Sequence, residues 1–301
     1  MSDTYRKTPP AANGTVDALL AGHGKTAKLG LYLALGGLGL FLLFLLLLHS
    51  PVVLILAILL VVAGLIVRSI AVGKMKTVAA GSLIPEALST VLEQVRYDAK
   101  SRISDNVVCH TDMGFPFDFD EIKGGDYVSG VYRGLRMEMS DLELVDVRRI
   151  HTKNGTRTQR VTVFRGQWII CQFGRELSAD VRLSERGALG QLFAAGGVKT
   201  ENDAFNKRFF IQSTSQHDVF YLLTPHMMER VLHMDALANG DSYLRFGRDG
   251  RVHIAVATGR NLFEVGADAN AEALREKFRS EIRSVTQLLD ALCLPESMSQ
   301  N

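Results

Sequence analysis

Apolar residues concentrate in two long runs near the start of the chain. Leu29–Leu48 is an uncharged run of twenty residues, and Val52–Val67 is a second run that ends at Arg68. A helix of twenty residues is about 30 Å long, which matches the hydrocarbon core of a bilayer. The short turn His49-Ser50-Pro51 joins the two runs. The pattern therefore predicts a transmembrane helical hairpin over residues 29–72, with the lipid bilayer as its partner.

Small residues recur along one side of each predicted helix. Gly30, Ala34 and Gly37 follow helical spacing in the first run, and Ala57 and Gly64 do so in the second. Small side chains let two helices approach closely in lipid, so we expect the two stripes to face each other. No ionisable residue lies inside either run, which argues against transport or proton relay through this hairpin alone.

Positive charge flanks the hairpin. Lys25 and Lys28 precede the first run, and Arg68, Lys74 and Lys76 follow the second, whereas the connecting turn has no Lys or Arg. The positive-inside rule then predicts a multi-pass protein of the inner (cytoplasmic) membrane, with both termini in the cytoplasm.

The soluble part differs from the hairpin in charge. Residues 1–76 contain seven Lys/Arg and two Asp/Glu, a net charge of +5, and the rest contains 27 and 30, a net charge of −3. A mildly acidic domain argues against nucleic acid as a partner, because nucleic-acid binding needs a basic face. Cys109, Cys171 and Cys293 lie far apart without CxxC spacing, which is typical of a reducing compartment. The cysteine usage and the positive charges that flank the hairpin both favour a cytosolic domain.

The segments around the hairpin have different patterns. Residues 1–28 are rich in small, polar, Pro and Gly residues and predict a flexible cytosolic tail. Residues 82–101 carry apolar residues near 3.6-residue spacing, including Leu88 and Leu92, and predict an amphipathic connector helix.

From Asn106 onward short strands dominate. Strand-like patterns occur in Val107–Cys109, Tyr127–Arg133, Leu135–Met139, Leu142–Ile150, Arg160–Phe164, Gln167–Phe173, Ala179–Leu183, Phe205–Thr214, Tyr243–Phe246 and Val252–Ala257. Asn154-Gly155 is a hairpin turn signal, and Gly124-Gly125 and Gly166 punctuate the run. One helix is predicted from Pro225 to about Leu237, with Thr224 as its N-cap and Pro225 as its first residue. A second helix is predicted over Ala271–Leu292. The order predicts an α+β domain of antiparallel β-sheets with flanking helices over residues 106–294, with a subdivision near residues 187–203.

Several short blocks come in a recognisable order. They are Gly125–Gly130, Val163–Trp168, Tyr221–Pro225 with Met227–Arg230, Gly250–Ala257 and Asn261–Glu264. With these blocks the chain resembles, over roughly residues 85–290, a bacterial membrane-protein family known only as a domain of unknown function. The resemblance implies a two-span hairpin followed by a cytosolic α+β domain, and it provides no catalytic residues.

One helix carries a candidate metal-binding set. His226, Glu229 and His233 have i, i+3, i+7 spacing and share one helix face, and imidazole and carboxylate groups can ligate zinc. The spacing is not HExxH, and the neighbouring Arg230 would repel a cation. We therefore favour the solvated face of an amphipathic helix over a metal site.

An acidic loop offers a second candidate. Asp118, Asp120, Glu121 and Asp126 could supply oxygen ligands to Ca²⁺ or Mg²⁺, but they lack the DxDxDG spacing, which favours a solvated loop.

Other reactive residues give weaker signals. Cys109-His110 with Asp112 is a candidate thiol–imidazole pair, although adjacent strand residues point to opposite faces. Cys171 is expected in the core. A mixed aromatic and basic set could bind anionic lipid headgroups, which attract basic residues. Its members are Tyr127, Tyr132, Arg133, Arg136, Arg148 and Arg149. Strand edges that are protected by charged side chains explain the same residues as well.

The sequence thus favours a membrane-anchored, cytosol-facing binding protein without a cofactor, whose partner is a protein or anionic lipid headgroups. The alternative is a membrane-bound, metal-dependent enzyme that uses His226, Glu229 and His233 or the loop Asp118–Asp126. Catalytic residues stay unknown on either hypothesis.

Overall fold

The computed structural model describes residues 13–45, 50–152, 155–174, 177–186, 197–267 and 270–292. Residues 1–12 of the predicted tail, His49, Asn154, residues 187–196 of the predicted subdivision and Cys293 lie outside these ranges. The chain divides into two compact units, residues 1–87 with 263–279 and residues 88–262 with 280–301. Each unit is described by itself.

The first unit is built on two long helices, α1 (Asn13–Leu43) and α2 (Pro51–Val78). Their stripes of small residues face each other, as predicted. A Cβ atom on Gly64 would lie 2.5 Å from both the Gly30 carbonyl oxygen and the Ala34 nitrogen, and one on Gly37 would lie 2.8 Å from the Ala57 carbonyl oxygen. The backbones therefore pack at a distance that only very small residues allow.

The prediction of a flexible tail over residues 1–28 is wrong from Asn13 onward, because α1 begins there. Val16 and Leu20 are buried. Asp17 accepts a hydrogen bond of 2.9 Å from Arg275 on α8 (Ala271–Ala291). Local composition favours a tail, but this packing and ion pair fix the segment as helix.

The connector helix predicted for residues 82–101 is also wrong in its second half. After α2 a π-helical turn (Ala79–Leu83) leads into α3 (Ile84–Ser89), and then Glu93–Asp98 forms strand β1. Tyr97 pairs with Val128 across the β1–β2 ladder. Pairing with a neighbouring strand thus overrides the helical periodicity, as tertiary contacts often do with weak local preferences.

The second unit is an antiparallel sheet with flanking helices, which confirms the predicted α+β class. Within the described residues its eight strands lie in the order β1-β2-β3-β4-β8-β7-β5-β6. After β1 the strands are β2 (Glu121–Tyr132), β3 (Leu135–Thr152), β4 (Gly155–Gln172), β5 (Val181–Glu185), β6 (Phe209–Gln212), β7 (Asp241–Phe246) and β8 (Arg251–Ala257). The helices are α4 (Asp105–His110), α5 (Asp203–Arg208), α6 (Gln216–Leu222), α7 (Pro225–Leu237) and α8.

Two predicted strands are wrong, and several others are longer than predicted. Val107–Cys109 lies in α4, and the first part of Phe205–Thr214 lies in α5. The Asn202 side chain caps the N-terminus of α5 by accepting from the Phe205 nitrogen. Gly166 is no turn residue: it lies inside β4, and a Cβ atom there would clash with the Val256 carbonyl oxygen. The glycine lets neighbouring strands pack closely instead of ending the strand.

Each face of the sheet has its own core. Leu142, Leu144, Phe164 and Trp168 form one apolar cluster with Ile103, Val108 and Met113 of the segment around α4. Phe115 stacks on Phe117 at 4.9 Å and meets the Trp168 ring edge-on at 5.8 Å. Since alternate strand residues point to opposite faces, the buried Met139, Ile169 and Ile254 belong to the other face.

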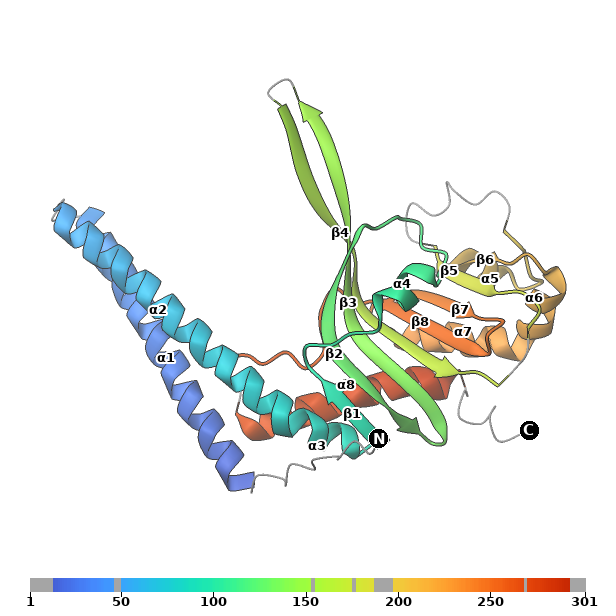
Figure 1. The fold of residues 1–301 in the computed structure, drawn as a ribbon, viewed down its shortest axis with the longest axis horizontal. Coiled ribbons are helices and arrows are strands. Elements are labelled where there is room, and N and C mark those ends of the chain that lie inside the picture. Colours follow the sequence, from blue (N-terminus) through green and yellow to red (C-terminus); the bar gives the residue numbers. More distant parts are fainter. Residues whose placement is uncertain are drawn as a thin grey trace, which may run out of the picture. The chain divides into compact units, whose positions relative to one another are not determined.

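The strands β3 and β4 extend beyond the other strands as a two-stranded ribbon (Figure 1). The β2–β3 ladder stops at Val145 and the β4–β8 ladder begins at Gln167, whereas β3 and β4 stay paired up to Thr152 and Gly155.

Candidate functional site

A row of polar side chains crosses one face of the sheet. The cross-strand register places Ser129, Glu138, Ile170, His253, Arg245 and Arg182 side by side on β2, β3, β4, β8, β7 and β5. The next row on the same face, through Trp168 and Tyr243, is covered by the α4 segment. The polar row therefore borders the apolar core, and polar groups beside an apolar surface are typical of binding sites.

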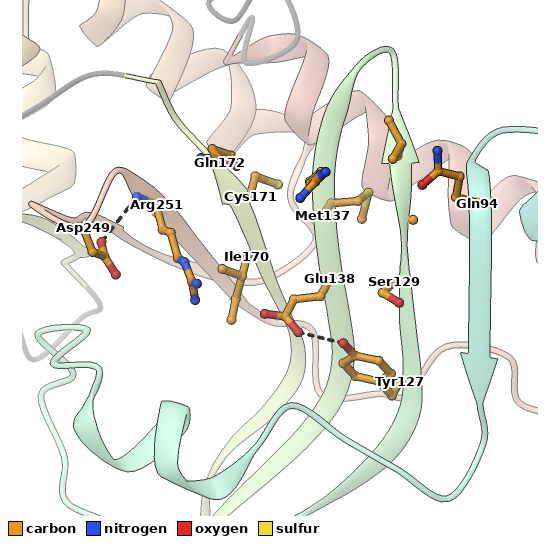
Figure 2. Close-up of a pocket in the computed structure, with 13 residues that line it drawn as sticks. Gln94, Tyr127, Ser129, Met137, Glu138, Ile170, Cys171, Gln172, Asp249 and Arg251 are labelled. Carbon is orange, nitrogen blue, oxygen red and sulfur yellow. Dashed lines mark hydrogen bonds between the residues drawn. The ribbon is translucent and has the colours of Figure 1, made fainter. Parts of the chain in front are cut away.

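The β2–β4 half of this row forms an open polar cavity of about 500 Å³. Figure 2 shows Tyr127 and Ser129 on β2 and Glu138 on β3, with Ile170 on β4 between Glu138 and Arg251. The Tyr127 hydroxyl donates a hydrogen bond of 2.8 Å to the Glu138 carboxylate. Burial raises the pKa of Tyr127, and the carboxylate of Glu138 adds to the rise. The phenol is therefore a fixed donor that orients Glu138.

Both signs of charge line this cavity. Arg136 and Arg251 are exposed guanidinium groups, and Glu138 and Asp249 are carboxylates. Such a set can bind a ligand that carries both donors and acceptors, such as a polar peptide segment. Cys171 also lines the cavity, but burial raises the pKa of its thiol far above its usual range. A protonated, buried thiol is a poor nucleophile.

The other half of the row is closed and held by hydrogen bonds. The Trp168 indole donates to His253 Nδ1 at 3.3 Å. Burial first, and the charge of Arg245 second, lower the pKa of His253 to about 4, so its imidazole is neutral at pH 7. Arg245 donates to Asp180 at 2.9 Å, and Arg182 pairs with Asp112. These contacts position side chains and leave none free to act as a base.

Asp141 lies in a buried network on the opposite face. Its carboxylate accepts hydrogen bonds from the Gln167 side chain at 2.9 Å and from the Leu262 backbone nitrogen at 2.6 Å. Burial raises the pKa of Asp141 to about 7, and the nearby Asp126 contributes. Asp141 could not be found from the sequence pattern, because its partners lie 26 and 121 positions away along the chain.

Two buried carboxylates that share one arginine were also not identified from the sequence. Arg208 binds Glu185 at 2.9 Å and Asp235 at 2.5 Å. Burial raises the pKa of Glu185 to about 7, with Asp235 adding to the rise. One guanidinium between two carboxylates cross-links β5, α5 and α7, which gives the cluster a structural role.

The proposed metal ligands His226, Glu229 and His233 are exposed on α7. The His226 and Glu229 side chains are 69% and 75% exposed, and their closest atoms are 3.8 Å apart. The opposite face of the helix is buried through Met227 and Val231. Within the described parts of the chain, no three His, Cys, Asp or Glu side chains are grouped closely enough to hold a metal ion.

The acidic loop is dispersed among separate partners. Asp120 accepts from the Val147 nitrogen at 2.7 Å, Glu121 pairs with Arg160 at 3.0 Å, and Asp126 accepts from Tyr97 at 2.5 Å. Asp118 is exposed. The loop therefore does not gather its carboxylates around a common point.

The remaining candidates are also separated. Cys109 and His110 are exposed on α4, where His110 hydrogen-bonds the Asn106 carbonyl at 2.8 Å. Tyr132 and Arg133 both bind Asp290 on α8, at 2.8 and 3.2 Å. Tyr127 and Arg136 line the cavity, while Arg148 and Arg149 lie on the ribbon. The aromatic and basic residues therefore do not form one surface.

Comparison with known proteins gives few relatives. No curated protein matches the chain. A similar solved structure is the mycobacterial trehalose monomycolate transport factor A, at 12% identity and a TM-score of 0.35, over 69% of this chain and 93% of that one. Residues 162–294 match the family described as "Protein of unknown function (DUF3137)", which confirms the resemblance to a family of unknown function.

Proposed function

We propose that the chain is a membrane-anchored binding protein. The membrane anchor is supported by where the exposed apolar side chains lie. In the described residues, all large exposed apolar side chains but Ile150, Phe220, Tyr221 and Leu237 lie between Leu19 and Ile70, on α1 and α2 and at Leu45 between them. Both helices are long and apolar enough to cross a membrane. Leaving such side chains in water costs about 1.5–3 kcal/mol each, and lipid removes this cost.

The orientation follows from the flanking charges. Lys25, Lys28, Arg68, Lys74 and Lys76 lie at the ends of the apolar runs away from the turn, which supports a bacterial inner-membrane protein with both termini in the cytoplasm. The sheet unit would then work beside the inner leaflet.

The binding role is supported by the cavity between Tyr127, Glu138 and Arg251. Its Glu138 carboxylate, which Tyr127 holds in place, its exposed guanidinium groups and its apolar floor at Ile170 suit a polar segment of a partner protein. Its thiol is protonated, and the buried His253 is neutral and already bonded. Binding thus accounts for the cavity better than catalysis does.

Carbonate extraction of the full chain tests the anchor. Wild type should stay in the membrane pellet, whereas Leu38→Arg with Leu59→Arg should shift it to the supernatant. An arginine in the middle of a span costs about 2.5–3.5 kcal/mol. Phe220→Arg with Leu237→Arg, at two exposed apolar residues outside α1 and α2, is the matched control and should not change the distribution. Wild-type protein in the supernatant would refute the anchor.

Thiol labelling tests the orientation. Cys109 is exposed on α4, so an impermeant maleimide should label it only after the cells are permeabilised. Ser50→Cys, in the turn between the helices, should be labelled in intact cells. The reverse pattern would place the sheet unit outside.

Photo-crosslinking tests the binding cavity. A crosslinker at the exposed Gln172 should give a product that Glu138→Ala with Arg251→Ala abolishes. A crosslinker at the exposed Gln216 on α6 is the control. Products that are insensitive to the double substitution would argue against a partner in this cavity.

A further inference from the structure

The ribbon of β3 and β4 beyond the sheet has no neighbouring strand in the described residues. Seven cross-strand pairs, from Asp146–Val161 to Thr152–Gly155, join only these two strands. Figure 1 shows the ribbon projecting away from the rest of the sheet. Two-stranded hairpins are marginally stable in water on their own. A projecting ribbon of this length is therefore suited to contact something outside its unit.

Beyond Asp146 the charged residues of the ribbon are all basic. Residues 147–160 contain no Asp or Glu, and the described residues among them include Arg148, Arg149, Arg157 and Arg160. The side chains of Arg148 and Arg160 are 60% and 58% exposed although they pair with Asp146 and Glu121 at the base of the ribbon. Arg149 and Arg157 are exposed as well. The outer part of the ribbon is basic in a region of the chain whose net charge is negative.

One apolar side chain accompanies these charges. Ile150 is 41% exposed and lies opposite Arg157 in the β3–β4 ladder. Within the described residues it is the one large exposed apolar side chain on the sheet strands. Basic residues around an exposed apolar residue fit the boundary between headgroups and acyl chains of a bilayer.

We propose that the ribbon docks on anionic lipid headgroups at the surface of the membrane that holds α1 and α2. The proposal rests on the membrane anchor of the proposed function. Anchoring makes the contact intramolecular, so a few weak charge contacts suffice without tight binding in solution. An acidic protein or a nucleic acid would match the charge but would gain nothing from the anchor, which is why the lipid surface is favoured.

The test uses the full chain reconstituted into vesicles of phosphatidylcholine alone or with phosphatidylserine at about three parts in ten, with brominated acyl chains as quencher. The native tryptophan, Trp168, is buried, and wild type therefore gives the background signal. Ile150→Trp places an indole on the ribbon. Its fluorescence should be quenched strongly only when phosphatidylserine is present, and added salt should reverse the effect.

Charge variants show whether the ribbon arginines cause the contact. Arg148→Gln, Arg149→Gln and Arg157→Gln in the Ile150→Trp chain should weaken the contact roughly a hundredfold and return quenching to the level of neutral vesicles. The matched control replaces three exposed arginines outside the ribbon, at Arg248, Arg260 and Arg283, and should leave quenching unchanged.

Four outcomes would overturn the proposal. They are equal quenching with and without phosphatidylserine, quenching that survives loss of the three ribbon arginines, an equal loss in the control variant, and protection of the indole by a DNA duplex instead of vesicles. A chain that is removed from the vesicles by carbonate would overturn the anchor as well. A chain that is retained but lacks anion-dependent quenching would overturn the ribbon alone.

Discussion

Asp141 allows a quantitative test of the sheet unit. Its carboxylate is buried and accepts from Gln167 and from the Leu262 nitrogen. Burial raises its pKa from 3.8 to about 7. The folded state therefore binds this proton more tightly than the unfolded state does. The free energy of unfolding falls as pH rises between these two values.

The size of the effect follows from the shift. A change of roughly three pKa units corresponds to about 4 kcal/mol, of which about 2–3 kcal/mol is lost between about pH 5 and about pH 8. Asp141→Asn removes the titration. Its amide oxygen accepts only one of the two N–H groups, which costs a constant amount at every pH. The variant should therefore gain about 2–3 kcal/mol relative to wild type over this interval.

The difference between the two proteins is the informative quantity. The pKa of His253 is lowered from 6.5 to about 4, so its contribution is lost as pH falls below 6.5 and opposes that of Asp141. Subtracting the wild-type pH profile from that of Asp141→Asn removes the His253 contribution, because both proteins share it. Urea unfolding of the full chain in micelles can be followed through Trp168, the single tryptophan. Asp118→Asn, an exposed carboxylate, should keep the wild-type slope. Parallel pH profiles for wild type and Asp141→Asn would refute the reasoning.

Three further substitutions test the packing. Gly64→Leu should separate α1 from α2, because a Cβ atom at this position would lie 2.5 Å from backbone atoms of α1. Energy transfer between labels on the two helices should therefore fall. Gly36→Leu is the control, since a Cβ atom there meets open space, and it should leave the energy transfer unchanged. Gly166→Ala should destabilise the sheet by about 3 kcal/mol in urea unfolding, since its Cβ clashes with backbone; a change under about 0.5 kcal/mol would contradict this. Thr224→Ala removes the cap that accepts from the Met227 nitrogen and should cost about 1 kcal/mol, with Thr224→Ser as the restoring control.

Strongly periodic and capped elements could be predicted from the sequence. The helix after Thr224-Pro225 has the predicted cap and first residue, and the Ala271–Leu292 helix matches α8 to within one residue. The helix hairpin is also found, because small residues at helical spacing define which faces meet.

Elements that depend on distant partners could not be predicted. β1 carries a helical pattern, yet Tyr97 pairs with Val128 on a strand about thirty positions further along the chain. The short segment Val107–Cys109 contains β-branched residues, which predicted a strand. Val108 packs into the apolar core from the helix α4 instead. Val108 is buried in α4, whereas Tyr97 on β1 is half-buried. In both segments the contacts with a distant part of the chain, and not the local pattern, decide the backbone conformation.

The blocks that carried the family resemblance read locally as turns and strands, but the structure gives several of them a shared role. Asp126 is hydrogen-bonded to Tyr97 and raises the pKa of Asp141. Gln167 bonds Asp141 and also the Arg260 carbonyl, and Leu262 donates its backbone nitrogen to the same carboxylate. Three blocks that look independent in the chain thus meet at one buried acid. Because a buried carboxylate without its donors would cost several kcal/mol, these blocks stabilise the sheet together, and substitutions in them should be non-additive.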